Sequence, residues 1–249
     1  MSGHNKWSSI KHKKGKEDKK RSKIFSKVTK EIMLAAREGG GDPEMNARLR
    51  NAIEHAKEVN MPQDNVDRAI KKGTGELEGT RIEEAHYEGY GPGGVALLVE
   101  VATDNKNRTA SEIKHIFSKY NGSMGSIGSV TWMFDRKGII DIEKDKYDFD
   151  KIMDIAIENG AEDVINEEET VEIITSDHDF SAVKNALNDV GIEMVRAEIT
   201  KIPQSTKKLD ESTASSLFKL IDKLDESDDV QNVYANYDID DKILEKLAE

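Results

Sequence analysis

Lysine side chains crowd the first thirty positions of this sequence, where ten lysines and one arginine stand against only two carboxylates. Ammonium groups suit phosphate oxygens, and a tryptophan among them offers a flat face on which a base can stack. A solubilising tail is the alternative, but like charges this dense repel one another unless a polyanion neutralises them. We therefore predict nucleic-acid binding by Lys6, Trp7, Lys11, His12, Lys13, Lys14, Lys16, Lys19, Lys20 and Arg21.

A second set of cations continues along the helix predicted to follow. Lys23, Lys27 and Lys30 lie about one turn apart and so share one face of that helix. We include them among the predicted nucleic-acid-binding residues, although a solvated helix face explains these three equally well.

A polar run between a predicted strand and a predicted helix is the second candidate for binding. Residues 103–109 read Thr-Asp-Asn-Lys-Asn-Arg-Thr. Helix capping explains one Asp or Asn at such a boundary, but not five consecutive polar or charged residues. Because functional groups concentrate on loops held by rigid elements, we expect a binding loop that contains Asn105, Lys106, Asn107 and Arg108.

Residues for other kinds of chemistry are missing. The sequence has no cysteine, which excludes disulfides, zinc-thiolate sites, iron–sulfur clusters and a thiol nucleophile. Its six histidines show no metal-binding spacing, and no Ser/His/Asp arrangement stands out. Gly122, Gly125 and Gly128 follow a predicted helix and precede a predicted strand, which is the reverse of a phosphate-binding loop. We expect no catalysis, no cofactor and no metal.

The formal net charge of −12 conceals an uneven distribution. Residues 1–75 carry 18 positive and 10 negative side chains, whereas the rest of the chain carries 19 and 39. Such asymmetry indicates a basic nucleic-acid-binding end on an acidic body. No stretch is apolar enough for a secretory signal or a membrane span, so we expect a cytoplasmic protein with no membrane partner.

The elements that must position these residues begin with a helical bundle. Residues 1–23 are nearly devoid of apolar side chains, and we expect a flexible basic arm there. Apolar stripes at helical spacing then predict three short helices over residues 24–75. Glycines at 39–41 end the first helix, Asp42-Pro43 begins the second, and Met61-Pro62 separates the second from the third.

The third predicted helix has polar residues suited to reading DNA, but they are mixed with acids. The residues that suit base edges or phosphates are Gln63, Asn65, Arg68, Lys71 and Lys72. Asp64 and Asp67 on the same helix would repel a phosphate backbone. An ordinary helix surface of mixed charge is therefore the preferred interpretation.

Strands and helices alternate beyond residue 76. Predicted strands at 82–88, 95–101 and 129–134 and a helix at 109–120 precede a βαββαβ segment, the order of the ferredoxin-like plait. A helix at 212–225, a strand at 230–237 and a helix at 240–248 follow it. The predicted fold class is multi-domain α+β, a three-helix bundle plus two α/β-sandwich domains. Of the two α/β-sandwich domains, the first is a discontinuous α+β domain formed by residues 76–135 and 204–249. The second is a ferredoxin-like domain, residues 136–203, which is inserted in the first.

Several segments resemble the YebC/PmpR family, densely over residues 3–134 and by length and layout beyond. Asn5 stands where that family's pattern has serine. The resemblance implies a three-domain cytoplasmic protein with a helical N-terminal domain and two α/β domains. The matching segments are Gly3-His4-Asn5-Lys6-Trp7, Ile10-Lys11-His12-Lys13-Lys14, Lys23-Ile24-Phe25, Lys30-Glu31-Ile32, Asn60-Met61-Pro62, Arg68-Ala69-Ile70-Lys71-Lys72-Gly73, Tyr87-Glu88-Gly89-Tyr90-Gly91-Pro92-Gly93-Gly94, residues 103–109, His115-Ile116-Phe117-Ser118-Lys119 and Gly128-Ser129-Val130-Thr131-Trp132-Met133-Phe134.

Two functions follow from the residues and the resemblance together. Bacterial family members are described as probable DNA-binding transcriptional regulators, which makes this the first hypothesis. A mitochondrial branch activates translation and bacterial relatives have been tied to relieving stalled ribosomes, so a ribosome-associated factor that binds rRNA is the alternative. A small-molecule sensor built on the βαββαβ segment is a third hypothesis, by analogy of fold alone. The sequence does not decide whether the protein binds DNA or rRNA, which target sequence it recognises, or its oligomeric state.

Overall fold

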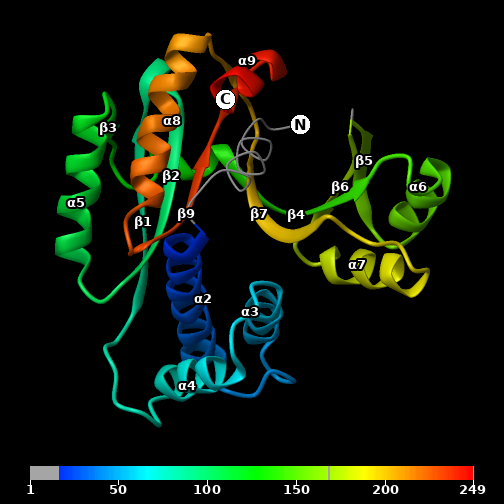
Figure 1. Cartoon of the computed structure of the whole chain (residues 1–249), viewed down its shortest axis with the longest axis horizontal. Coiled ribbons are helices and arrows are strands. Elements are labelled where there is room, and N and C mark those ends of the chain that lie inside the picture. The colour runs from blue at the N-terminus through cyan, green and yellow to red at the C-terminus, as the bar shows by residue number, and fades with distance from the viewer. Residues whose placement is uncertain (1–16, 168, 249) are drawn as a thin grey trace. The chain divides into compact units, whose positions relative to one another are not determined.

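The computed structural model describes residues 17–167 and 169–248, and its contacts divide them into two compact units. The inserted unit is Trp132–Thr206. The main unit comprises the described residues before and after that segment, 17–131 and 207–248. Figure 1 shows both units coloured along the chain, and each is described here by itself.

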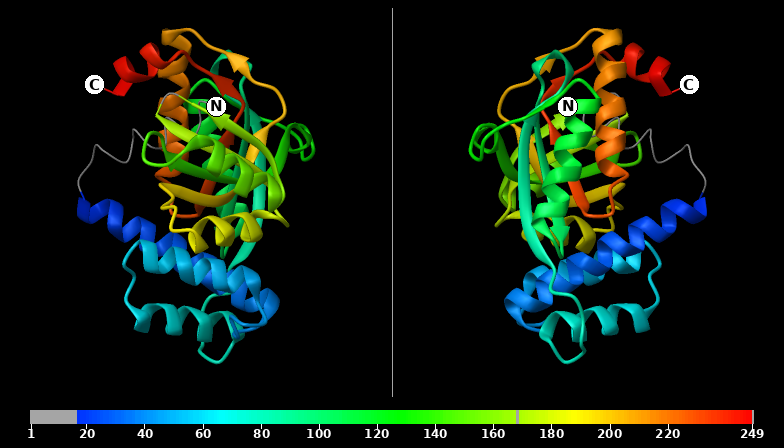
Figure 2. Two further views of the ribbon diagram at one scale, coloured as in Figure 1. Left: turned by 90° about the vertical axis from the view of Figure 1, so that its right-hand side faces the viewer. Right: turned by 90° about the vertical axis from the view of Figure 1, so that its left-hand side faces the viewer.

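Three helices form the first part of the main unit: α2 (Glu17–Gly39), α3 (Ala47–Glu58) and α4 (Gln63–Thr74). Both α3 and α4 pack against α2 (Figures 1 and 2). The apolar stripes predicted from the sequence meet in one core, which includes Val28, Ile32, Leu49, Ala52 and Val66.

The first helix begins earlier than expected. The backbone of residues 17–23, assigned to the flexible arm in the sequence analysis, is helical from Glu17. Apolar content was the wrong criterion here, because Lys and Arg are good helix formers and Glu17 and Asp18 complement the positive end of the helix dipole. Residues 1–16 lie outside the described residues.

The second helix begins later than expected, at Ala47 rather than near Asp42-Pro43. Asn46 is its N-cap, and its side-chain oxygen accepts a hydrogen bond from the Leu49 amide at 3.0 Å. Its side-chain amide also donates to the carbonyls of Ala35 and Gly40, both at 2.8 Å. One buried asparagine therefore joins the end of α2 to the start of α3.

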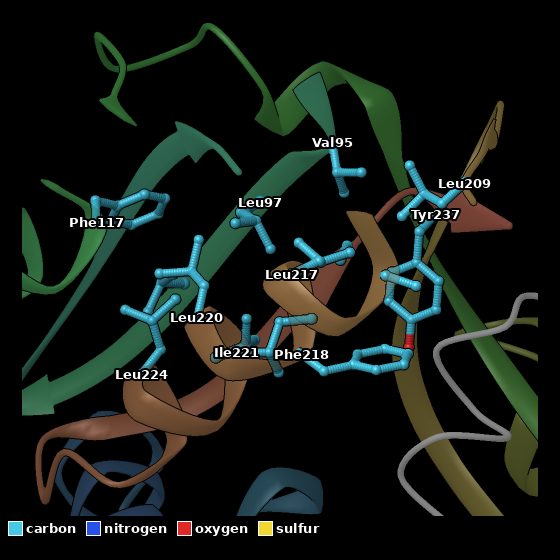
Figure 3. Packing of buried hydrophobic residues seen from close by; sticks show 14 of the residues in the cluster. Val95, Leu97, Phe117, Leu209, Leu217, Phe218, Leu220, Ile221, Leu224 and Tyr237 are labelled. Atoms are coloured by element: carbon cyan, nitrogen blue, oxygen red, sulfur yellow. The ribbon is translucent and has the colours of Figure 1, made fainter. Parts of the chain in front are cut away.

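The main unit continues as an antiparallel sheet in the order β3-β1-β2-β9. Its strands are β1 (Glu83–Tyr90), β2 (Ala96–Thr103), β3 (Ser123–Met124) and β9 (Val230–Ala235). The helices α5 (Lys106–Lys119) and α8 (Glu211–Asp225) share an apolar core with this sheet. Figure 3 shows Leu97, Phe117, Leu217 and Leu220 within that core.

The strand predicted at 129–134 is not part of this sheet. A short 3-10 turn, η2 (Thr131–Met133), occupies that stretch, and the two-residue β3 is the edge strand instead. The cause is the buried Glu88, whose carboxylate accepts hydrogen bonds from the amides of Gly128 (2.7 Å), Val130 (2.5 Å) and Thr131 (2.9 Å). Those amides are then unavailable to a neighbouring strand.

The remaining elements of the main unit are short. A 3-10 turn, η1 (Pro92–Gly94), joins β1 to β2. The strand predicted at 230–237 is divided, because β10 (Tyr237–Asp238) pairs in parallel with β8 (Lys207–Lys208) rather than continuing β9. The last helix is α9 (Asp241–Ala248).

The inserted unit runs β4 (Phe134–Glu143), α6 (Phe149–Glu158), β5 (Ala161–Asn166), β6 (Thr170–Ser176), α7 (Phe180–Asp189) and β7 (Arg196–Pro203). This is the βαββαβ order expected from the sequence. The sheet order is β5-β6-β4-β7, and every neighbouring pair is antiparallel. Both helices pack on one face of the sheet, around Ile140, Ile173 and Val183.

Within residues 17–167 and 169–248, no helix combines the length and apolar character that a membrane crossing requires.

Candidate nucleic-acid interface

The predicted binding residues fall into three groups in the structure. Lys6, Trp7, Lys11, His12, Lys13, Lys14 and Lys16 lie outside the described residues, so their role stays a prediction. Lys19, Lys20, Arg21, Lys23, Lys27 and Lys30 belong to α2. Asn105, Lys106, Asn107 and Arg108 lie at the beginning of α5, with Asn105 as its N-cap.

The lysine face of α2 is bound to the main unit's own backbone. Lys23 Nζ donates to the Glu226 carbonyl at 2.6 Å, and Lys27 Nζ donates to the Gln231 carbonyl at 3.2 Å. Lys30 Nζ donates to the carbonyls of Ala102 (3.0 Å) and Asp228 (2.8 Å). The Glu226 and Asp228 carbonyls lie near the end of α8, where the helix dipole favours cations, whereas the other two carbonyls belong to β9 and β2.

In this structure these three lysines contact protein, and their predicted role in nucleic-acid binding stays a prediction. Their ammonium groups join α2 to the sheet part of the main unit. Arg21, earlier on the same helix, lies over the ring of Phe25 with 5.4 Å between its guanidinium carbon and the ring centroid.

Asp229 is the residue at which the two predicted clusters meet. Its Oδ1 lies 2.9 Å from Lys30 Nζ. Its Oδ2 accepts hydrogen bonds from Thr109 (2.7 Å), Arg108 (2.9 Å) and Thr103 (3.0 Å). Burial alone raises the pKa of a carboxyl, but hydrogen bonds from Lys30, Arg108 and Thr109 offset that effect and hold the pKa of Asp229 well below its usual range.

The polar run 103–109 is not the loop that we expected. The helix α5 begins at Lys106, and the Asn105 side chain caps it by accepting from the Arg108 amide at 3.1 Å. Arg108 also binds Asp104 at 2.6 Å, and Lys106 binds Glu83 at 2.8 Å, which lowers the pKa of the Glu83 carboxyl. Capping and ion pairing within the chain therefore account for most of this run.

The charges at this junction balance. Three cations, Lys30, Lys106 and Arg108, face the carboxylates of Glu83, Asp104 and Asp229. Such an arrangement holds helices and strands together but offers no surplus positive charge to a phosphate. Sequence reasoning missed Asp229, because it stands 199 residues from Lys30 and 121 from Arg108 and no spacing pattern connects them.

A cavity of about 770 Å³ beside the α4–β1 connection is lined by cations, of which the sequence analysis considered only Lys72. Arg37, Lys72 and Arg81 line it together with one carboxylate, Glu78, and the backbone of Gly73 and other residues of the connection. Arg37 donates a hydrogen bond to the Ile82 carbonyl at its edge. Arg81 Nε also lies 3.3 Å from Glu83 Oε1, a carboxylate outside the lining. A lining with three cations and one carboxylate suits an anion such as a phosphate.

The surface of α4 offers little for reading bases. The Gln63 side-chain amide donates to Asp67 Oδ1 at 2.8 Å, so this side chain is bound within the helix. Among the described residues, no group of three or more His, Asp or Glu side chains is placed to hold a metal ion.

Comparisons with known proteins cover nearly the whole chain. Residues 5–76 match the family described as "TACO1/YebC protein N-terminal domain", and residues 82–237 match "TACO1/YebC second and third domain". A "Probable transcriptional regulatory protein" from Desulfosudis oleivorans is 57% identical over 245 residues, 98% of this chain and 100% of that protein. A protein of the same name from Syntrophus aciditrophicus is 57% identical over 249 residues, the full length of both.

One solved structure is similar throughout. The crystal structure of a conserved hypothetical protein from Aquifex aeolicus matches with a TM-score of 0.82 at 49% identity. The match covers 93% of this chain and 96% of that one. It supports the observed architecture, in which three helices precede two four-stranded antiparallel sheets with their helices.

Proposed function

Because this chain belongs to the TACO1/YebC family, we propose that it is a non-enzymatic regulator of transcription that acts in the cytoplasm by binding duplex DNA. The lysine-rich N-terminal segment makes the main contact, and the helical part that follows adds to it. The observation that carries the proposal is the surplus of positive charge in residues 1–30 of a chain whose net charge is −12.

Contacts within the chain favour some of the predicted residues over others as phosphate contacts. The positive charges of Lys30, Lys106 and Arg108 are matched by carboxylates, and Lys23 and Lys27 bind backbone carbonyls. This leaves the lysine-rich segment up to Arg21 and the cavity with Arg37, Lys72 and Arg81 as the sources of phosphate contacts. The acidic remainder of the chain would limit indiscriminate coating of DNA.

Binding to rRNA is the second candidate function, and one feature of α4 favours it. Asp64 and Asp67 repel phosphates, and Gln63 is bound to Asp67, so the helix has few groups left for base edges. A lysine-rich segment without a base-reading helix suits the dense phosphates of folded rRNA. In that case the protein acts on the ribosome as a translation factor.

We also propose a domain organisation that matches these roles. The segment before α2 is the contact arm, and the helical bundle and the discontinuous α+β domain form the main unit. The inserted unit is a ferredoxin-like plait, supported by its βαββαβ order and its β5-β6-β4-β7 sheet.

The test is a salt titration of binding by the full chain. Fluorescence anisotropy with labelled DNA duplexes, scrambled duplexes and an rRNA fragment would be compared between 50 and 300 mM salt. The arm variant replaces Lys11, Lys13, Lys14 and Lys16 by glutamine. Each lost phosphate contact on duplex DNA removes about 0.9 from the log–log salt slope, so the slope should fall by up to about 3.6.

The matched control replaces Lys114, Lys151, Lys208 and Lys219, four exposed lysines beyond the bundle, by glutamine. It changes the net charge equally and should leave the slope unchanged. An equal fall of the salt slope in both variants would show that binding depends only on net charge, which would contradict the proposal. Tight binding to rRNA with none to duplex DNA would support the second candidate instead.

A further inference from the structure

The cavity beside the α4–β1 connection lies wholly within the main unit. Figure 1 shows this connection, residues 75–82, running from α4 to β1. The lining comes from α2, from the end of α4 and from the connection itself. The volume of about 770 Å³ falls within the roughly 300–1,000 Å³ of pockets that hold small organic ligands. A lone phosphate ion would fill only a small part of it, so the volume points to a larger ligand.

Two hydrogen bonds hold the connection in place at its two ends. The Leu77 amide donates to the Lys71 carbonyl in the last turn of α4 at 3.1 Å. The Arg37 guanidinium, from the last turn of α2, donates to the Ile82 carbonyl. The cavity is therefore formed before a ligand enters, and a preformed site loses less entropy on binding.

The three cations of the lining keep donors for an anion. Lys72 is exposed, and its side chain passes close to Gly79. Within the part of the chain that the structure describes, the Lys72 ammonium makes no hydrogen bond or ion pair. The ion pair of Arg81 with Glu83 uses Nε, and the hydrogen bond of Arg37 uses one terminal nitrogen. Because a guanidinium has five N–H donors, both arginines retain donors for a phosphate.

Apolar side chains share the lining with these cations. Met33 and Ile82 are half-buried, and Leu77 is 42% exposed. A small anion would leave them in water, whereas a flat aromatic ring would cover them and gain a favourable contact with the methionine sulfur. Glu78, the carboxylate of the lining, can accept from amino or hydroxyl groups. The matching ligand combines an anion with an aromatic ring that carries such donors.

We propose that this cavity binds one nucleotide. The phosphate binds Arg37, Lys72 and Arg81, and the base lies against the apolar part of the lining. A free nucleotide and an unpaired nucleotide of a nucleic-acid strand share this chemistry. A base in a duplex does not enter, because it would first have to leave the stack. For a nucleotide in a strand the inference rests on the proposed function, which it deepens, whereas for a free nucleotide it stands by itself.

Nuclear magnetic resonance of the isotope-labelled full chain tests where a nucleotide binds. The arm variant is used, so that the arm does not take up the phosphates. Titration with ATP in the absence of Mg²⁺ should shift the backbone amide signals of residues 75–82, whereas those of the inserted unit should not move. Adenosine and tripolyphosphate should each bind at least about tenfold more weakly than ATP, because each matches only one kind of lining.

Two further substitutions in that chain test the two kinds of lining. K72Q/R81Q removes two cations and should weaken ATP binding roughly 10- to 100-fold. L77S removes apolar contact and should weaken ATP binding about threefold while leaving tripolyphosphate unaffected. The matched control R50Q/K57Q makes the same change of charge at exposed positions of α3, outside the lining, and should bind ATP as the parent chain does.

A comparison of three ligands identifies the source of the nucleotide. ATP represents a free nucleotide, a 5′-phosphorylated single-stranded oligoadenylate represents a nucleotide in a strand, and a blunt duplex represents paired bases. Both of the first two should shift the signals of residues 75–82, and the one that binds more tightly there is assigned as the source. The duplex should shift these signals least.

Four results would overturn the inference. They are unshifted signals at residues 75–82, equal affinity for ATP and tripolyphosphate, equal weakening in K72Q/R81Q and R50Q/K57Q, and a duplex that binds there as tightly as the single strand. Equal affinity for ATP and tripolyphosphate would assign the cavity to a plain anion instead.

Failure of the proposed function gives a different result. If the arm variant keeps the salt slope of the wild type while ATP shifts residues 75–82, the cavity site is supported and the proposed function is contradicted. If the slope falls as expected while these signals stay unshifted, only the cavity site is contradicted.

Discussion

Replacing Asp229 by asparagine tests whether this carboxylate joins the helices of the main unit to its sheet. The variant keeps the side chain's shape but puts an N–H donor where a carboxylate oxygen accepts from Lys30, Thr103, Arg108 or Thr109. The ion pairs of Asp229 with Lys30 and with Arg108 both lose their negative partner. The Lys30 side chain, which is only 16% exposed, is then left without a carboxylate.

The expected loss can be worked out from these contacts. Removing one partner of a buried ion pair costs about 3–5 kcal/mol, and hydrogen bonds to charged groups contribute about 1.5–3 kcal/mol each. Arg108 is 52% exposed and keeps Asp104, so solvent screening removes most of its share. Lys30 also keeps its two carbonyl acceptors. We expect a net loss of about 3 kcal/mol.

Hydrogen exchange of the amides in α2 and α5 measures this loss locally. A change of about 3 kcal/mol corresponds to roughly 100-fold faster exchange through unfolding, with α6 and α7 of the inserted unit as internal reference. The matched control is D228N, because the exposed Asp228 side chain changes while its carbonyl still accepts from Lys30. Less than tenfold acceleration in D229N, or equal acceleration in D228N, would refute the reasoning.

The lowered pKa of Asp229 predicts that its contribution to the free energy of unfolding depends on pH. The folded state lowers the pKa of Asp229 below its ordinary value of 3.8, so the fold favours the ionised form. The stabilisation is therefore complete above about pH 4 and is lost as the pH falls toward the folded pKa. Thermal unfolding followed by circular dichroism should show a constant difference between wild type and D229N from pH 8 to 5, narrowing below pH 4.

Three further substitutions test other contacts. E88Q puts a donor against the amides that Glu88 binds, and we expect protection of residues 126–131 from exchange to fall by about 2 kcal/mol, against unchanged protection in β2. N46A removes a cap and two buried hydrogen bonds, and thermal unfolding should show a loss of about 2 kcal/mol, whereas N51A on the exposed side of α3 should show almost none. G138A brings a methyl group into collision with Thr175 Oγ1 and the Phe180 ring, so exchange should accelerate in the inserted unit alone, and acceleration in both units would contradict this account.

Local pattern was sufficient for most elements. The βαββαβ order of the inserted unit and the three helices of the bundle follow from hydrophobic periodicity, which depends on near neighbours in the chain. Boundaries were wrong where a side chain from elsewhere decided them. Asn46 caps α3 and also binds the end of α2, and the Glu88 carboxylate holds 128–131 out of the sheet.

The charge asymmetry, the lack of thiol chemistry and the composition of the lysine-rich segment can all be read from the order of residues. These are properties of residue types and their order, and folding does not change them. Whether the α2 lysines meet phosphate, water or protein is a different kind of question, because helical spacing places them on one face in every case.

Their contacts with protein depend on the folded chain. Their acceptors, Asp229 and the carbonyls near it, lie about 200 residues along the chain, and folding brings them within 3.2 Å. Charge type is local, but the partner of a charge is set by long-range packing, and the partner decides what the charge does.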